Sequence, residues 1–180
     1  MTEDADATAI LRCRNGDRRA FDALIARHAR QVFSAVYRIL HDREDAYDVT
    51  QTAFMTAYEH LDQYDAAQPF RGWLYRIAVN QALDVVRARR PAEALAEDTE
   101  DGQEQPDERA SHDETDSVLQ AALMQLDANY RALIILKHLQ GCSYEEIAQI
   151  LECPLKTVKS RLFTARHVLR DILVARGWLP

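Results

Sequence analysis

Glycine, proline and cysteine are all scarce in this sequence. Its 180 residues include five glycines, with no glycine-rich loop of the kind that cradles phosphate, and no nucleophile stands beside a recognisable general base. Three widely spaced cysteines, Cys13, Cys142 and Cys153, form no Cys-x-x-Cys pair, and the histidines are equally scattered. We therefore expect reduced, mostly buried thiols, no metal site, no cofactor and no enzymatic activity.

Long apolar runs are also missing. No stretch approaches the roughly 18 apolar residues that indicate a transmembrane helix. The N-terminus, Thr2–Asp6, is acidic where a signal peptide would be basic and then apolar. The sequence therefore predicts a cytoplasmic protein with no membrane insertion.

Acidic residues gather in one segment. The chain has a formal charge of −7, yet residues 1–90 carry 13 basic and 13 acidic side chains, and residues 118–180 carry 8 and 5. Residues 91–117 carry 1 basic and 11 acidic side chains. Between Glu93 and Asp116 this segment is almost free of apolar residues after Leu95. Its composition predicts a disordered acidic linker.

Apolar residues recur with helical spacing on both sides of this linker, and no strand-like alternation appears. We predict an all-α fold with two small helical domains, residues 1–91 and 118–180, joined by a flexible linker at 92–117. The first domain is expected to start after the turn Asn15–Asp17. It should contain three helices: Phe21–Leu40, Glu44–Leu61, and one from Trp73 to Arg90 that Pro91 closes.

Each of these three helices has an expected core face. The first helix contributes Phe21, Leu24, Ile25, His28, Val32 and Val36–Leu40. The second contributes Ala46, Val49, Ala53, Phe54, Ala57 and Leu61. The third contributes Trp73, Leu74, Ile77, Ala78, Ala82, Leu83 and Val86.

The last third of the chain has the pattern of a helix-turn-helix. Ser143 and Glu146 have the Ser-x-x-Glu spacing of a capping box, which predicts the start of a short helix. Pro154 cannot continue that helix, so the chain should turn near Cys153. A second helix is expected to begin at about Lys156.

The second helix of this motif has two different faces. Its apolar stripe consists of Val158, Leu162, Ala165 and Leu169. Its opposite face carries Lys156, Lys159, Ser160, Phe163, His167 and Arg170. A basic face is also compatible with plain solvated surface. The capped first helix, the short turn and the basic second helix together favour a helix that lies in the major groove of DNA.

Three stretches of the first domain accompany this motif: Asp45–Gln51, Phe54 and Phe70–Asn80. Together with the helix-turn-helix they resemble the extracytoplasmic-function (ECF, group 4) sigma factors of bacterial RNA polymerase. The resemblance omits only the first ten residues and the linker. It implies a dissociable subunit of core RNA polymerase that directs promoter-specific transcription initiation.

The resemblance also implies how promoter DNA is bound. The C-terminal domain would contact the minus-thirty-five element through Lys156, Thr157, Lys159, Ser160, Arg161, Phe163, Thr164 and Arg166. The N-terminal domain would open the minus-ten element through Tyr64, Gln68, Trp73, Arg76 and Asn80. The loop Gln63–Gln68 corresponds to the place where relatives receive a flipped base. A core position is the alternative for Trp73.

A polymerase-binding surface is implied on the second helix. Glu44, Asp45, Asp48 and Gln51 are expected on one side of it, where relatives face a basic coiled coil of the largest polymerase subunit. Without the resemblance, these carboxylates would be a solvated first turn favoured by the helix dipole. For the acidic linker, the resemblance implies a path through the polymerase, and a soluble, extended tether is the alternative.

Two positions suggest how the chain is controlled. Tyr47 and Thr52 stand where relatives commonly have Glu, which implies a weaker polymerase contact. Phosphorylation of Thr50 or Thr52 by a Ser/Thr kinase would restore negative charge. An anti-sigma factor is the alternative means of control. The alternative to a sigma factor is a free-standing helix-turn-helix transcriptional regulator, which would have no use for strand-opening residues in Trp73–Asn80.

Overall fold

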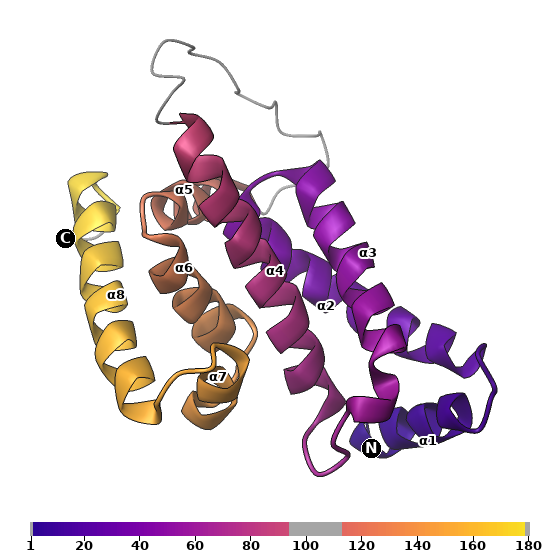
Figure 1. Cartoon of the computed structure of the whole chain (residues 1–180). Coiled ribbons are helices and arrows are strands. Elements are labelled where there is room, and N and C mark those ends of the chain that lie inside the picture. The colour runs from indigo at the N-terminus through magenta and orange to yellow at the C-terminus, as the bar shows by residue number, and fades with distance from the viewer. Residues whose placement is uncertain (1, 94–112, 179–180) are drawn as a thin grey trace.

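Every element that the structure describes is helical. The computed structural model of the chain describes residues 2–93 and 113–178, and no strand occurs in these ranges (Figure 1). The N-terminal half contains α1 (Thr2–Arg14), α2 (Ala20–Leu40), α3 (Arg43–Glu59), the 3₁₀ helix η1 (Leu61–Gln63) and α4 (Phe70–Glu93). The C-terminal half contains α5 (Asp113–Met124), α6 (Ala128–Ile134), the π-helix η2 (Ile135–Leu139), α7 (Tyr144–Ile150) and α8 (Leu155–Ala175). The predicted all-α fold is confirmed.

The helices α2, α3 and α4 pack around the core of the N-terminal half. The expected core positions of the second predicted helix are all buried: Ala46, Val49, Ala53, Phe54, Ala57 and Leu61. On α4, Trp73, Ile77 and Val86 pack against the core but are only partly buried. The prediction is wrong for Ile25, which is 38% exposed. Its side of α2 borders an open groove instead of the core.

The helix α1 precedes the expected start of the domain. Its residues Ala9 and Ile10 are buried and pack against the core. The carboxylate of Asp6 is also buried, and its Oδ2 lies 2.8 Å from His28 Nε2 on α2. An N-terminal helix was not predicted because only these few residues of an otherwise acidic and small-residue stretch face the core.

Two other boundaries differ from the prediction. The helix α4 continues two residues past Pro91 to Glu93, a difference within the usual uncertainty of a helix end. Most of the predicted acidic linker, residues 94–112, lies outside the described residues. The predicted linker extends too far, because residues 113–117 already belong to α5.

The helix-turn-helix forms as the sequence predicts. Ser143 Oγ accepts from Glu146 N at 3.0 Å, and Glu146 Oε2 accepts from Ser143 N at 2.6 Å, which completes the capping box of α7. Pro154 precedes α8, which begins at Leu155. The apolar stripe of α8 also faces inward: Val158, Leu162 and Ala165 are buried and Leu169 is partly buried.

The two halves pack against each other (Figure 1). One buried residue of this contact is Arg131 of α6, which is 5% exposed. Its guanidinium donates to Ile39 O at the end of α2, and also to Leu123 O at 2.9 Å and Leu126 O at 3.1 Å. Burial lowers the pKa of Arg131, but an arginine stays charged in proteins. One buried cation therefore connects both halves.

We expect Arg131→Met to lower the free energy of unfolding by about 3 kcal/mol, because several buried carbonyl oxygens lose their donor at once. Urea unfolding followed by circular dichroism measures this change. Arg170→Met is the matched control, since Arg170 is exposed on α8 and pairs with its neighbour Asp171, and it should change stability by less than about 0.5 kcal/mol. Equal midpoints for the two variants would contradict the role of Arg131.

Candidate nucleic-acid and polymerase interfaces

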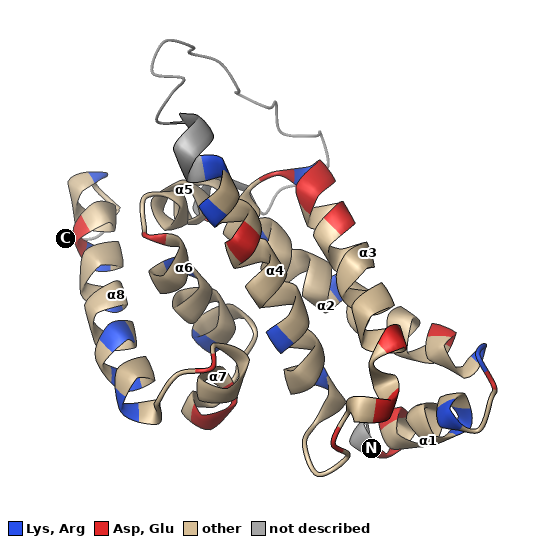
Figure 2. Cartoon of the chain, viewed as in Figure 1, with Lys and Arg blue, Asp and Glu red and all other residues tan. Residues whose placement is uncertain are grey.

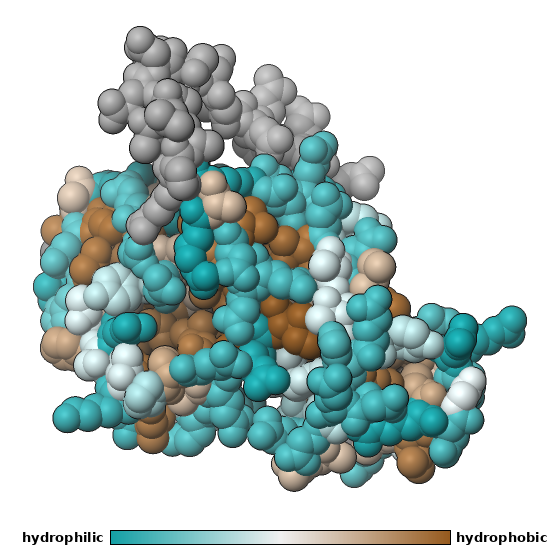
Figure 3. Space-filling view, in the orientation of Figure 1, coloured by the Kyte–Doolittle hydropathy of each residue, from teal (hydrophilic) through white to brown (hydrophobic). Residues whose placement is uncertain are grey.

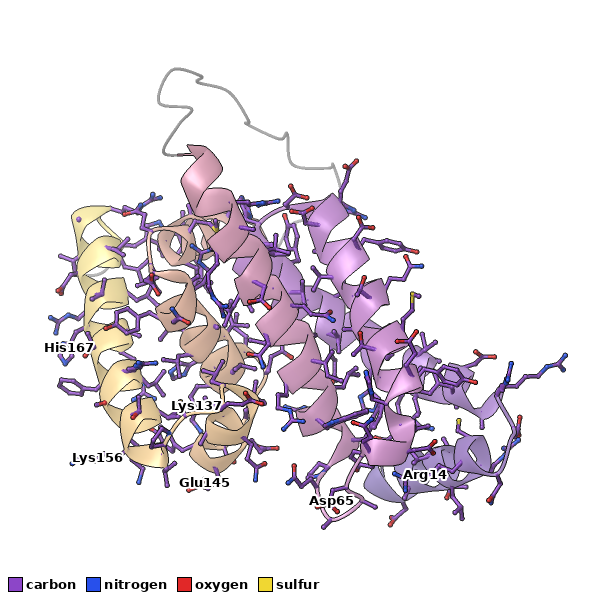
Figure 4. All side chains as sticks on the ribbon, viewed as in Figure 1. Arg14, Asp65, Lys137, Glu145, Lys156 and His167 are labelled. Carbon is purple, nitrogen blue, oxygen red and sulfur yellow. The ribbon has the colours of Figure 1, made fainter. Side chains whose placement is uncertain are left out.

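The residues predicted for the minus-thirty-five element lie on α8, most of them on its outer side. Thr157 is partly buried, and the following are exposed: Lys156, Lys159, Ser160, Arg161, Phe163, Thr164 and Arg166. Figure 2 shows basic residues at several places along this helix, and Figure 4 places Lys156 and His167 on the side away from α6. The exposed face of α8 thus carries several cations.

This surface also has hydrogen-bonding and apolar groups. Ser160 Oγ donates to Thr157 O at 3.1 Å, and Thr164 Oγ1 donates to Ser160 O at 3.2 Å. Both hydroxyl oxygens keep lone pairs that can accept from a base. Phe163 is 63% exposed, and its ring centroid lies 4.3 Å from that of His167. An exposed ring at this place suits contact with a thymine methyl group.

Arg166 has a different setting from its neighbours. Its Nε donates to His138 Nε2 at 3.1 Å, and both residues border a groove of about 270 Å³ that Leu119 and Leu123 also line. Burial, followed by the charges of Arg166 and Lys137, lowers the pKa of His138. A neutral ring can accept this hydrogen bond. Arg166 therefore lies at the edge of the recognition surface.

Sequence analysis missed a second cation beside Lys159. Lys137 Nζ lies 4.7 Å from the centroid of the Tyr144 ring, and Lys159 Nζ lies 6.0 Å from the same centroid. Lys137 also donates to Cys142 O at 3.0 Å. Lys137 belongs to η2, ahead of the helix-turn-helix pattern, so only the fold brings it next to Lys159. The two cations add positive charge beside Tyr144, the first residue of α7.

An aromatic cluster holds the loop before α4. The ring centroid of Tyr64 lies 5.7 Å from that of Phe70 and 5.2 Å from that of Trp73, and the centroids of Phe70 and Trp73 lie 5.8 Å apart. Tyr64 is 7% exposed, and its hydroxyl donates to the carbonyl of Gln68. Tyr64 thus holds the loop from its buried side, whereas Gln68 is exposed. Trp73 packs against the core but stays partly exposed.

Arg76 and Asn80 lie one turn apart on α4, and both are partly exposed. Arg76 Nη1 lies 3.7 Å from Glu152 Oε1 of the C-terminal half. Asn80 follows Phe70 by ten residues, which is about 15 Å along a helix. Asn80 and the loop are therefore too far apart to contact the same base.

A buried hydrogen-bond network joins α4 to the C-terminal half. Tyr75 Oη donates to Gln140 Oε1 at 2.7 Å, and Arg71 donates to Gln140 O and, at 3.5 Å, to Cys142 Sγ. Burial raises the pKa of Tyr75 to about 12. Burial also raises the pKa of Cys142. Both groups therefore stay protonated at neutral pH and serve as packing and hydrogen-bonding groups.

The predicted polymerase-binding residues of α3 do not all share one side. Three of them are exposed: Glu44, Asp48 and Gln51. Figure 2 shows the acidic start of this helix. Asp45 instead turns toward α4, where its carboxylate pairs with Arg89. The prediction that all four residues share a side is wrong for Asp45, because a partner 44 positions later in the chain binds it.

An apolar groove lies beside the exposed acidic residues. It runs between α2 and α3 with a volume of about 640 Å³, and Ile25 and Phe33 line its α2 side. On α3, Tyr47 is 65% exposed and Met55 is 55% exposed. Hydrophobic residues also reach the surface between α3 and α4, and at other places in the same view (Figure 3). Exposed apolar patches of this kind mark interaction sites.

The two candidate phosphorylation sites differ in exposure. Thr50 is 8% exposed, and its hydroxyl donates to Ala46 O at 2.7 Å. Thr52 is exposed. The expectation for Thr50 needs correction, because its position shares the core face with Ala46 and Ala53 and a kinase cannot reach it without local unfolding. Thr52 has its hydroxyl at the surface.

Of the expected mostly buried thiols, only Cys142 is fully buried. All three are free; Cys142 is buried, whereas Cys13 and Cys153 are partly exposed. Among the residues that the structure describes, no three His, Cys, Asp or Glu side chains gather into a metal site. None of the described helices combines the length and the apolar composition that crossing a membrane requires.

The structure thus combines an exposed basic face on α8, exposed acidic residues at the start of α3 and, between them, a loop followed by α4 (Figure 2), an arrangement that suits a transcription initiation factor. Two family models match the chain: Sigma-70 region 2 over residues 24–92 and Sigma-70, region 4 over residues 117–168. The chain belongs to the sigma-70 family, as an ECF factor. It is an alternative sigma factor that binds core RNA polymerase and promoter DNA and directs transcription initiation. The alternative of a free-standing regulator does not fit, because region 2 accompanies the helix-turn-helix.

Full-length relatives support this assignment. The chain is 35% identical over 185 residues to RNA polymerase sigma-H factor of Pseudomonas aeruginosa, with 96% of each chain covered. It is 37% identical over 176 residues to ECF RNA polymerase sigma-E factor of Escherichia coli K12, covering 91% of this chain and 92% of the relative. Both alignments include almost all of the two halves.

Two solved structures have a similar fold. CnrH in complex with the cytosolic domain of CnrY matches with a TM-score of 0.73 and 30% identity, over 95% of this chain and 98% of CnrH. The sigma factor RpoE in complex with the anti-sigma factor NepR from Bartonella quintana matches with a TM-score of 0.71 and 26% identity, over 86% of this chain and 97% of RpoE.

We expect the contact between α4 and the C-terminal half to depend on Gln140 and hardly on Glu152. Gln140→Ala leaves the buried Tyr75 hydroxyl without its acceptor, which should cost about 1 to 2 kcal/mol of unfolding free energy. Glu152→Gln weakens an exposed pair with Arg76 and should cost less than about 0.5 kcal/mol. Thermal and urea unfolding measure both variants. A larger loss for Glu152→Gln would overturn this ranking.

Proposed function

We propose that each described surface has one task in promoter-specific initiation. The exposed side of α3 docks on core RNA polymerase, the loop before α4 together with Arg76 and Asn80 opens the minus-ten element, and α8 binds the minus-thirty-five element. The observation that carries this proposal is the placement of the acidic and basic surfaces on opposite outer helices of the molecule (Figure 2). Run-off transcription by core polymerase with and without the chain tests it, and an unchanged transcript pattern would contradict it.

The contacts on α8 divide into two classes. Lys156, Lys159 and Arg161 extend from the exposed face, where long cations neutralise phosphates with little dependence on sequence. Ser160 and Phe163 lie on the same face with short or apolar groups that suit base edges. Arg166, at the edge of this face, and Lys137, behind Lys159, would add phosphate contacts on either side.

The minus-ten contacts follow from the distance between the loop and Asn80. The exposed loop residues include Gln68, and the hydrogen bond from the Tyr64 hydroxyl holds the loop in place. Exposed polar groups on a fixed loop suit the binding of an unstacked base. Asn80, about 15 Å further along α4, would contact another nucleotide of the same strand. Arg76, between them and only weakly paired with Glu152, would hold the connecting phosphate.

The polymerase surface combines charge with apolar area. Glu44 and Asp48 stand beside the groove that Tyr47 and Met55 border. A basic helical partner could therefore bury apolar side chains in the groove while its cations meet the carboxylates. The exposed Tyr47 supplies apolar contact area at the position where relatives commonly have Glu. This area would compensate for the missing carboxylate in polymerase binding.

Control of the chain is proposed to come from a protein partner. RpoE, which is similar in fold, was solved with an anti-sigma factor, and this supports an anti-sigma factor for the present chain. A Ser/Thr kinase acting on the exposed Thr52 is the second candidate. The chain is proposed to act in the cytoplasm, where core polymerase is, and to have no catalysis of its own.

We expect Asp48→Lys to weaken binding to core polymerase about tenfold, because it reverses a charge that faces the basic partner. Fluorescence anisotropy with purified core polymerase measures the affinity. Asp45→Asn is the control on the same helix: it removes one of the two carboxylates that pair with Arg89, the other being Asp42, and should lower stability more than polymerase affinity. If the two variants lose affinity equally, the exposed side of α3 is not the docking surface.

Asn80→Ala should leave the closed promoter complex intact yet reduce strand opening, because it removes a hydrogen-bonding group needed only for unpaired DNA. Permanganate footprinting reports unpaired thymines, and a loss of about tenfold in their reactivity is expected. Asp84→Ala, one turn further along α4 and exposed, should open the promoter normally. Normal opening by Asn80→Ala would remove this residue from the site.

A further inference from the structure

A cavity of about 390 Å³ separates α1 from the loop that precedes α4. Ala7, Ile10 and Arg14 line it from α1, and Gln68 and Phe70 line it from the opposite side. Figure 4 places Arg14 of α1 and Asp65 of the loop at the same end of the molecule. The loop proposed to receive a promoter base therefore faces a helix that no predicted site includes.

Arg14 ties the two sides of this cavity together. Its Nη2 donates to Leu61 O at 2.8 Å and to Tyr64 O at 2.5 Å, and its Nε donates to Leu61 O at 3.3 Å. Leu61 is the first residue of η1, and Tyr64 directly follows the end of η1, where the loop begins. The guanidinium thus fixes the start of the loop, while the hydroxyl of Tyr64 fixes its end at Gln68.

The α1 side of the cavity is itself rigidly held. Asp6 is buried between Arg27 and His28 of α2, and it also lines the cavity. Ala9 and Ile10 are 6% and 4% exposed in the core. A helix that served only to cover the core would not need a buried carboxylate at one end and an arginine bonded to a loop at the other.

The chemistry of the cavity suits a flat base. Ile10 and Phe70 provide apolar surface, and a nucleobase stacks on apolar and aromatic faces. Arg14 and Gln68 provide polar groups around this surface, which suits the hydrogen-bonding edge of a base. The Sigma-70 region 2 match starts at residue 24, so it does not include α1.

We propose that α1 forms the second wall of the strand-opening site: an unstacked base of the non-template strand enters the cavity between α1 and the loop, and Arg14 is the positioning residue that holds the loop open to receive it. This inference rests on the proposed minus-ten function of the loop. It adds that the first fourteen residues take part in promoter opening, through Ala7 and Arg14.

Two pairs of variants test this inference in the holoenzyme. Ala7→Phe places a ring in the cavity, and Arg14→Gln releases the loop. Each has a matched control on α1: Ala5→Phe adds the same ring at an exposed position outside the cavity lining, and Arg12→Gln removes an exposed cation that pairs with Asp17. The probe is the non-template single strand of a promoter selected by the wild-type holoenzyme, intact or with one abasic site at each position in turn.

We expect wild type and both controls to lose affinity about tenfold when one particular base is removed. Ala7→Phe and Arg14→Gln should bind the intact strand about tenfold more weakly and be insensitive to that abasic site. A purely structural role for α1 would weaken all strands equally and keep the abasic effect, which would overturn the inference. Wild-type-like behaviour of both variants would also overturn it. If the wild-type holoenzyme opened no promoter at all, the proposed function itself would fail.

Discussion

The buried guanidinium of Arg131 constrains how the two halves pack together. It donates both to Ile39 O at the end of α2 and to carbonyls around the end of α5. A buried cation without such partners would cost several kcal/mol, so the side chain is satisfied only while α2, α5 and α6 stay packed. The same packing brings α4 against the C-terminal half, where Tyr75 donates to Gln140.

The same packing leaves the functional surfaces free. The exposed acidic side of α3 and the basic side of α8 lie on opposite flanks of the molecule (Figure 2). Between them lies α4, whose Arg71 and Tyr75 hydrogen-bond to the C-terminal half. Arg76 of the same helix is partly exposed and has only a weak ion pair across to Glu152. The hydrogen bonds to the C-terminal half and most of the proposed DNA contacts thus use different side chains of one helix.

Local patterns made much of this structure predictable, and long-range partners account for what was missed. The capping box of α7 and the core face of α3 follow from spacings within one helix. The i, i+4 relation of Thr50 to Ala46 could also have revealed its burial. In contrast, the pairing of Asp45 with Arg89 and the position of Lys137 beside Tyr144 arise from tertiary packing. Of the candidate site, the exposed face of α8 was predictable, whereas the cavity beside α1 was not.

The docking of the two halves has a thermodynamic consequence for any ligand of the chain. A partner that binds only when the halves separate must offset the free energy of their contact. A partner that binds the halves in the present arrangement has no such cost. Such coupling is reciprocal: if a ligand of one half changes the affinity of the other half for its own ligand, the second ligand changes the affinity for the first by the same factor. The surfaces of α3 and α8 are then linked although they share no residue.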